Sequence, residues 1–118
     1  MNIGIVGTRR RDSETAYHKV WVAFFDIYKE GDRIVSGGCS YGGDKFAERI
    51  AKSHSIPITI HYAQWHKHGK SAGFIRNTDI AKDSDILIAC VASDRIGGTE
   101  DTIKKFKQFH PEGQLILV

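Results

Sequence analysis

The sequence predicts an α/β protein in which 118 residues form one domain, residues 1–118, around a five-stranded, mostly parallel sheet. Short apolar runs alternate with longer segments whose apolar residues recur at helical spacing. The connections between them are short, as in parallel sheets built from strand–helix–strand units. Three of the apolar runs end directly in glycine-bearing turns, which gather at the carboxyl edge of such sheets. Together these observations predict a Rossmann-like three-layer sandwich.

The first half of the chain is expected to hold three strands and two helices. The expected strands are residues 2–6, 33–36 and 57–61, and the expected helices are residues 13–28 and 44–53. Ser13 or Asp12 is the predicted N-cap of the first helix, because short polar side chains accept the free N–H groups of a first turn. Gly31 is its predicted stop.

The second half is expected to add two helices and two strands. A polar, aromatic and histidine-rich segment, residues 63–70, is predicted to be a loop. The remaining elements are a helix at 71–82, a strand at 85–91, a helix at 99–109 and a strand at 114–118. The strand at 85–91 is a continuous apolar run, which is typical of a central strand covered on both faces. Thr99 is the predicted cap of the last helix, which is expected to bury Ile103, Phe106 and Phe109.

The first helix carries apolar residues on two sides. One face consists of Ala16, Val20, Ala23, Phe24 and Ile27. A second stripe, Tyr17, Trp21 and Phe25, follows at a spacing of four residues. A helix that is apolar on two sides is usually covered on two sides. The second stripe is therefore either part of the core or a contact in a homodimer.

Composition indicates an ordinary cytoplasmic protein with no membrane partner. No apolar run approaches the roughly 20 residues of a membrane span, and the basic run Arg9–Arg11 interrupts any leader-like segment. Two cysteines, Cys39 and Cys90, are too few for a disulfide framework and are expected to be reduced. The net charge of +3 suits a phosphate-bearing partner without demonstrating nucleic-acid binding.

Several common sites are disfavoured by spacing. Gly38–Gly42 matches the G-x-S-x-G nucleophile elbow, and Asp94 and His110 follow in hydrolase order, but further glycines intervene and an oxyanion loop is missing. The histidines match no metal-ligand pattern, so no metal is expected. G-x-G-x-x-G and Walker A motifs are absent, and no cofactor is predicted.

What remains is a set of polar groups and glycines that converge if the fold is right. The predicted ligand-binding residues are Gly7, Thr8, Arg9, Ser36, Gly37, Gly38, Gly43, Asn77, Gly97, Gly98 and Thr99. Backbone N–H groups in such turns bind anions, usually phosphate. Arg76 would fork two phosphate oxygens; the alternative is a surface salt bridge.

The order of these motifs resembles the YspA-like branch of the SLOG superfamily, Rossmann-like proteins related to DprA and to the LOG cytokinin-activating enzymes. The resemblance is carried by Val6-Gly7-Thr8-Arg9, Val35-Ser36-Gly37-Gly38, Gly42-Gly43-Asp44, Trp65 through Arg76-Asn77, and Gly97-Gly98-Thr99. It implies a nucleotide-type ligand held by the glycine turns, often in a homodimer.

The resemblance also implies a reaction. LOG enzymes hydrolyse the N-glycosidic bond of nucleoside 5′-monophosphates with an Arg and a Glu, and Arg76 is similar in placement to that Arg. Thr102 occupies the Glu position, while Glu100 and Asp101 point about 200° and 100° away from it on a helix. A carboxylate in a different place does not inherit an acid–base role, because geometry decides first.

Three functions follow from these observations. The first is binding of a nucleotide or ADP-ribose-like molecule with cleavage of its N-glycosidic bond, in which Arg76, Glu100 and Asp44 would be the catalytic residues. The second is a sensor or sequestering protein that binds the same ligand without turnover. The third is single-stranded nucleic-acid binding through Arg9–Arg11 and exposed aromatics such as Trp65.

Overall fold

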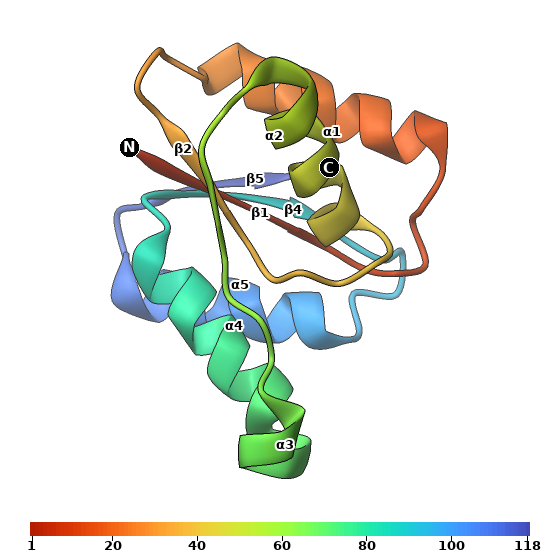
Figure 1. Ribbon diagram of the computed structural model, residues 1–118, viewed down its shortest axis with the longest axis vertical. Coiled ribbons are helices and arrows are strands. Elements are labelled where there is room, and N and C mark those ends of the chain that lie inside the picture. The colour runs from red at the N-terminus through yellow and green to blue at the C-terminus, as the bar shows by residue number, and fades with distance from the viewer.

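A computed structural model describes residues 1–118 and has three layers, with a sheet between two pairs of helices (Figure 1). The strands are β1 (Asn2–Gly7), β2 (Arg33–Ser36), β3 (Ile58–Ile60), β4 (Ile86–Cys90) and β5 (Gln114–Leu117). Their order is β3-β2-β1-β4-β5, and every neighbouring pair is parallel. The predicted fold class is confirmed, and the sheet is parallel throughout.

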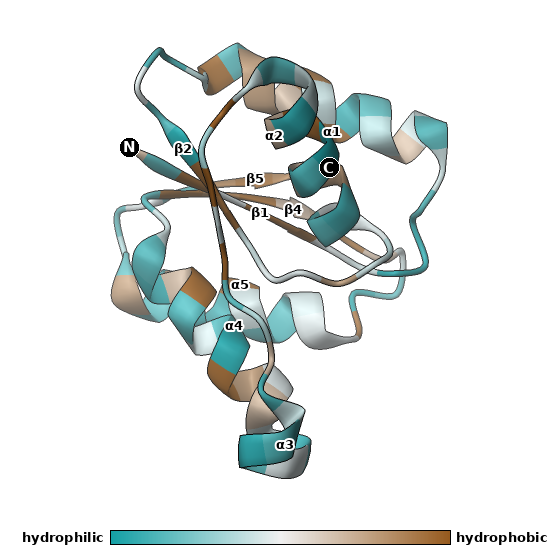
Figure 2. Ribbon diagram, in the orientation of Figure 1, coloured by the Kyte–Doolittle hydropathy of each residue, from teal (hydrophilic) through white to brown (hydrophobic).

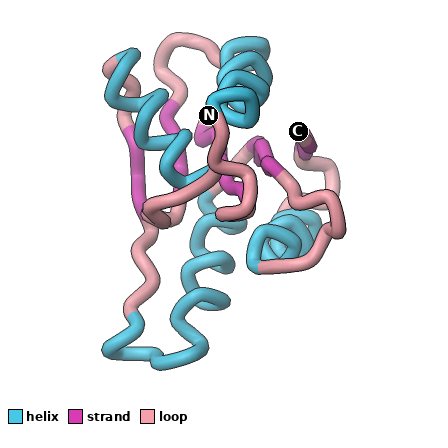
Figure 3. The backbone as a smooth tube through the Cα atoms, turned by 90° about the vertical axis from the view of Figure 1, so that its right-hand side faces the viewer, coloured by secondary structure: helices cyan, strands magenta, loops and turns pink.

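Two helices cover each face of the sheet (Figures 1 and 3). The helices are α1 (Glu14–Ile27), α2 (Gly43–His54), α3 (Trp65–His68), α4 (Ala72–Asp83) and α5 (Gly98–Phe109), with a 3₁₀ turn η1 (Gly69–Ser71) before α4. Helices α1 and α2 share one face, and α4 and α5 share the other. Apolar residues concentrate in the strands and polar residues on the outer helix faces (Figure 2). Helix α3 projects beyond the sheet. None of the helices combines the length and hydrophobicity needed to cross a bilayer.

The start of α1 follows from its cap. The Ser13 side chain accepts a hydrogen bond from the Ala16 N–H at 3.1 Å, as predicted, and Glu14 places a negative charge in the first turn. The helix ends with Tyr28 as its C-cap, and Gly31 lies beyond it with φ +96°. The helix thus ends one residue before the predicted end at Tyr28, and Gly31 is not its C-cap.

The second apolar stripe of α1 is partly covered within the chain by α2, and its three residues are half-buried. The ring centroids of Tyr17 and Phe46 are 5.5 Å apart, and the ring of His54 lies 4.6 Å from that of Phe25. The Trp21 indole N–H also donates to His54 Nε2 at 3.3 Å. Because α2 packs on this stripe, the apolar character of the stripe is explained in part without a second copy of the chain.

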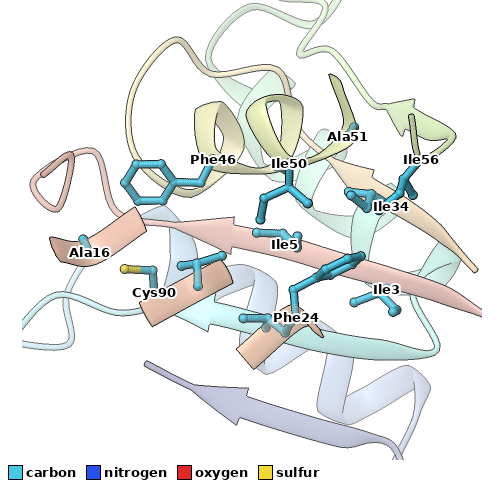
Figure 4. Close-up of a cluster of buried hydrophobic side chains, with 13 residues drawn as sticks. Ile3, Ile5, Ala16, Phe24, Ile34, Phe46, Ile50, Ala51, Ile56 and Cys90 are labelled. Carbon is cyan, nitrogen blue, oxygen red and sulfur yellow. The ribbon is translucent and has the colours of Figure 1, made fainter. Parts of the chain in front are cut away.

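Each face of the sheet has its own apolar core. The core under α1 and α2 includes Phe24 and Phe46 packed against Ile5, all at most 2% exposed (Figure 4). The core under α4 and α5 is centred on Phe106 and Leu87, both fully buried. All five residues of β4 are buried, which confirms the central strand predicted from its continuous apolar run.

Helix α2 starts directly against the end of β1. A methyl group at Gly43 would lie 2.3 Å from the backbone nitrogen of Gly7 and from the carbonyl carbon of Val6. Only glycine permits this approach of two main chains. The contact brings the turn after β2 next to the turn after β1, which is how these two segments come to share one site.

Three details differ from the sequence-based expectations. Residues predicted as a loop, 63–70, contain α3 and the start of η1, because the Lys67 and His68 N–H groups both bond to the Gln64 carbonyl and close one turn. Thr99 lies inside the first turn of α5, whose N-cap is Gly97. Phe109 is 44% exposed at the end of that helix instead of buried.

Candidate functional site

The segments that follow β1, β2, β3 and β4 meet at the carboxyl edge of the sheet and enclose a cavity of about 790 Å³. The cavity lies beside β1 and β4, where the strand order reverses. Ligands of open α/β sheets bind at this kind of position. The volume falls within the range of roughly 300–1,000 Å³ found for small-molecule sites.

Most of the predicted site residues line this cavity. They are Gly7, Thr8, Arg9, Gly37, Gly38, Asp44, Arg76, Asn77, Gly97, Gly98, Thr99 and Glu100. Ser36 and Gly43 do not line it: Ser36 is fully buried beneath the turn after β2, and Gly43 packs against the backbone of β1. These two residues shape the site from behind.

The turn after β1 presents one free guanidinium. The Thr8 N–H donates to the Cys90 carbonyl at 3.0 Å, and the Thr8 hydroxyl accepts from the Arg10 N–H at 3.3 Å, which fixes the turn. Arg9 is exposed at the cavity, and no hydrogen bond or ion pair within the chain engages its side chain. Its charge is therefore available to an anionic ligand.

Arg10, which was not predicted to belong to the site, joins two walls of the cavity. Its Nη1 and Nη2 donate to the two oxygens of Asp94, both at 2.8 Å, and Nη2 also donates to the Ile96 carbonyl at 2.9 Å. This hydrogen-bonded pairing lowers the pKa of Asp94 to about 2. The segment between β4 and α5 is thereby tied to the turn after β1.

Arg11 is used inside the protein. Its Nη1 donates to the carbonyl oxygens of Val91 at 3.0 Å and Val118 at 2.6 Å. With Arg10 also engaged, the basic run Arg9–Arg11 does not offer three free guanidinium groups to a nucleic-acid backbone.

The carboxyl group of Asp44 is buried under the turn after β2. Its Oδ2 accepts the Cys39 N–H at 3.0 Å, and its Oδ1 lies 3.2 Å from Ser36 Oγ. Ser36 Oγ also lies 3.1 Å from the Ile5 carbonyl. A hydroxyl has a single proton, so Ser36 Oγ–H can donate to the Asp44 carboxylate or to the Ile5 carbonyl but not to both at once; a proton on Asp44 Oδ1 would let both contacts form.

Burial of the Asp44 carboxyl also favours its protonated form. It raises the pKa of the Asp44 carboxyl, against the opposing effects of the Cys39 N–H and the positive charge of Arg76. Burial thus disfavours the fixed negative charge that stabilisation of an oxocarbenium ion would require.

Arg76 and Asn77 link the turn after β2 to the start of α5. Arg76 Nη1 donates to the Gly37 carbonyl at 2.7 Å, and its Nε donates to Asn77 Oδ1 at 3.1 Å. Asn77 Nδ2 in turn donates to Asp101 at 3.1 Å and to the Gly98 carbonyl at 3.3 Å. Arg76 thus makes no salt bridge, and part of its donor set is already used by the backbone.

Helix α5 points an uncapped first turn at the cavity. Its N-cap is Gly97, no side chain caps it, and Gly98 and Thr99 line the cavity. Free N–H groups and the helix dipole favour an anion at such a position. Glu100 also lines the cavity, but Arg95 holds both of its carboxylate oxygens, at 2.8 and 2.9 Å.

Two aromatic side chains complete the far wall. Tyr62 and Trp65 come from the segment after β3 and line the cavity. Trp65 was named only in the family motif and as a nucleic-acid contact, and Tyr62 was not among the predicted site residues. The signal that was available is the presence of large aromatics in an otherwise polar connection at a carboxyl edge.

The arrangement excludes the hydrolase triad suggested by the G-x-S-x-G match. Ser40 is exposed and does not line the cavity, and Asp94 is engaged by Arg10. His110 lies beyond the other end of α5, where its Nε2 is 3.0 Å from the Ala81 carbonyl. The three side chains are not assembled.

No group of three His, Cys, Asp or Glu side chains is placed to hold a metal ion. Comparison of the chain with protein-family models, curated proteins and solved structures gave no match.

Proposed function

We propose that the cavity binds a nucleotide or a nucleotide-derived ligand, such as a nucleoside monophosphate or an ADP-ribose-like molecule. One observation carries the proposal: the free guanidinium of Arg9 and the uncapped start of α5 line the same cavity as two exposed aromatic rings. Anion-binding groups at one wall and apolar rings at another suit a ligand that has a phosphate and a base.

The charges around the cavity favour an anion. Arg9 and Arg76 make no ion pair within the chain, whereas Arg95 pairs with the carboxylate of Glu100 and Asp94 pairs with Arg10. Burial raises the pKa of Asp44 and so disfavours its charged form. A guanidinium and a phosphate form strong charge-assisted hydrogen bonds. The motif resemblance to SLOG proteins leads to the same class of ligand.

Binding without turnover is the function that the geometry supports best. Cleavage of an N-glycosidic bond needs a carboxylate free to act on the sugar or on its attacking water. Glu100 is held by Arg95, and Asp44 is bonded to Ser36 and Cys39. We therefore favour a sensor or sequestering role over a phosphoribohydrolase, and both over single-strand binding, because Arg10 and Arg11 are engaged internally.

Thermal unfolding with a panel of nucleoside mono-, di- and triphosphates and ADP-ribose tests the proposal. A ligand at 100 times its dissociation constant stabilises by about 2.7 kcal/mol, which corresponds to about 10 °C for a domain of this size. Arg9→Ala should reduce the shift, while Arg33→Ala, an exposed arginine at the opposite edge of the sheet, should not. No shift with any ligand would refute the proposal.

The same mixtures are then analysed for released base. We expect the ligand to be recovered intact. Free base that appears with the wild type but not with Arg76→Ala or Glu100→Ala would establish an N-glycosidase instead of a binding protein.

A homodimer and a cytoplasmic location stay predictions from the sequence. The mass of the protein in solution tests the first, and cell fractionation tests the second.

A further inference from the structure

Two large aromatic side chains at the cavity are left mostly uncovered. Tyr62 is 63% exposed and Trp65 is 60% exposed, although both line the cavity. An aromatic side chain that finds a partner buries roughly 150–250 Å². Exposed apolar surface gathered at a concave site marks a place where something binds.

Tyr62 packs closely on one glycine, and the edge of Trp65 lies near another. A methyl group at Gly38 would come within 2.5 Å of Tyr62 Cε1, so the ring lies almost on the main chain there. Gly38 also has φ +75°, which disfavours any other residue. The Trp65 ring reaches to 3.4 Å from a methyl group at Gly73. The main chain at Gly38 thus supports the Tyr62 ring, and both rings leave most of their surface free.

The two walls of the cavity differ in chemistry. Tyr62 and Trp65 are uncharged and planar, whereas Arg9 and the first turn of α5 are suited to an anion. Arg76 lies in the lining of the same cavity and is held in place by the Gly37 carbonyl at 2.7 Å. A ligand that satisfies both walls must combine a flat aromatic group with a negative charge.

We propose that Tyr62 and Trp65 form the platform on which the base of the ligand stacks. The proposal rests on the proposed function and deepens it, because it narrows the ligand class to purine or pyrimidine nucleotides. A sugar phosphate or inorganic phosphate has no base to stack on the two rings. Stacking on aromatic side chains discriminates little between bases, because every base has a π-face. All four common bases should therefore bind, with purines favoured by their larger area.

Calorimetric titration with AMP, GMP, CMP, UMP and ribose 5-phosphate tests the platform. The proteins are the wild type, Tyr62→Ala, Trp65→Ala and the conservative variants Tyr62→Phe and Trp65→Phe. Phe74→Ala is the matched control, because Phe74 is 59% exposed on α4 and does not line the cavity. Thermal unfolding of each variant verifies that it is folded before titration.

We expect the nucleotides to bind more tightly than ribose 5-phosphate. Each alanine variant should lose about 5- to 150-fold in nucleotide affinity, the range measured for loss of one stacking ring, and should bind ribose 5-phosphate as the wild type does. The phenylalanine variants should retain most of the affinity, and Phe74→Ala should match the wild type.

Two results would overturn the platform, and they are distinguishable from each other. If nucleotides bind but ribose 5-phosphate binds equally well and the alanine variants lose nothing, the platform is wrong and nucleotide binding stands. If none of the five compounds binds the wild type, the proposed function fails together with the platform.

Tryptophan fluorescence gives an independent readout. The chain has two tryptophans, and in a Trp21→Phe background only Trp65 emits. Stacking of a base on Trp65 should quench this emission at saturation with AMP, and ribose 5-phosphate should not. Unchanged emission at saturating AMP would contradict base stacking at Trp65.

Discussion

The buried carboxyl group of Asp44 leads to a prediction about stability and pH. An asparagine at this position can keep both contacts, because its carbonyl oxygen accepts the Cys39 N–H and its amide donates to Ser36 Oγ. Asp44→Asn should therefore change the free energy of unfolding at pH 7 by less than about 1 kcal/mol. Asp44→Ala leaves the Cys39 N–H without a partner and should cost about 1–3 kcal/mol.

These magnitudes convert to measurable melting shifts. With about 2.1 cal/mol/K of unfolding entropy per residue, a chain of 118 residues shifts by about 4 °C for each kcal/mol. Asp44→Ala should melt about 4–12 °C below the wild type, and Asp44→Asn should melt within about 4 °C of it. The conservative variant separates loss of hydrogen bonds from loss of charge.

The pH dependence has a definite sign. Burial raises the pKa of Asp44 above its ordinary value of 3.8, so between that value and the raised pKa the folded protein binds more protons than the unfolded chain. Stability of the wild type relative to Asp44→Asn should then fall as the pH rises through this window and level off above it. It should be highest below pH 3.8.

Urea unfolding from pH 3.5 to pH 8 measures this difference, with Asp79→Asn, an exposed carboxylate on α4, as the control. A relative stability that rises with pH would refute the reasoning. It would mean that Asp44 is an ordinary ionised group stabilised by Arg76.

Further predictions concern packing, charge and capping. Gly43→Ala should destabilise by about 3 kcal/mol or more, since its methyl group meets the backbone of Gly7, and a wild-type urea midpoint would contradict this contact. Asp94 should titrate near pH 2 by NMR, and Arg10→Ala should return its pKa toward the ordinary range; an unchanged titration would rule out the pair. Ser13→Ala should cost about 1 kcal/mol in chemical unfolding by removing the α1 cap, whereas Ser13→Asp should cost much less.

The fold could be predicted because its signals are local and repeated. Apolar runs alternate with segments whose apolar residues recur at helical spacing. The Ser13 cap and the buried run of β4 can each be recognised from a few consecutive residues. Helix α3 was missed because a single turn has no period to detect. The second apolar stripe of α1 was visible in the sequence, but the helix that packs on it was not, because α2 lies about 30 residues further along the chain.

The candidate site was predictable where glycine turns mark the ends of strands, and not where function depends on pairing. Nothing in three adjacent arginines indicates that Arg9 is free while Arg10 is engaged, because the partner of Arg10 is Asp94, far along the sequence. In the same way the sequence does not show that the Glu100 carboxylate accepts hydrogen bonds from Arg95 and is therefore not free. Such pairings are set by tertiary structure.

The central position of β1 has a consequence for how the chain is made. Ile3 pairs with Ile34 of β2 on one side and with Ile86 of β4 on the other. During synthesis β1 emerges first, gains β2 early, and then keeps an open apolar edge until residues beyond 86 are available. Open strand edges template association between chains, and contacts between distant residues form slowly. A fragment that ends before β4 should therefore aggregate, and nascent chains of this protein should need protection until the second half is translated.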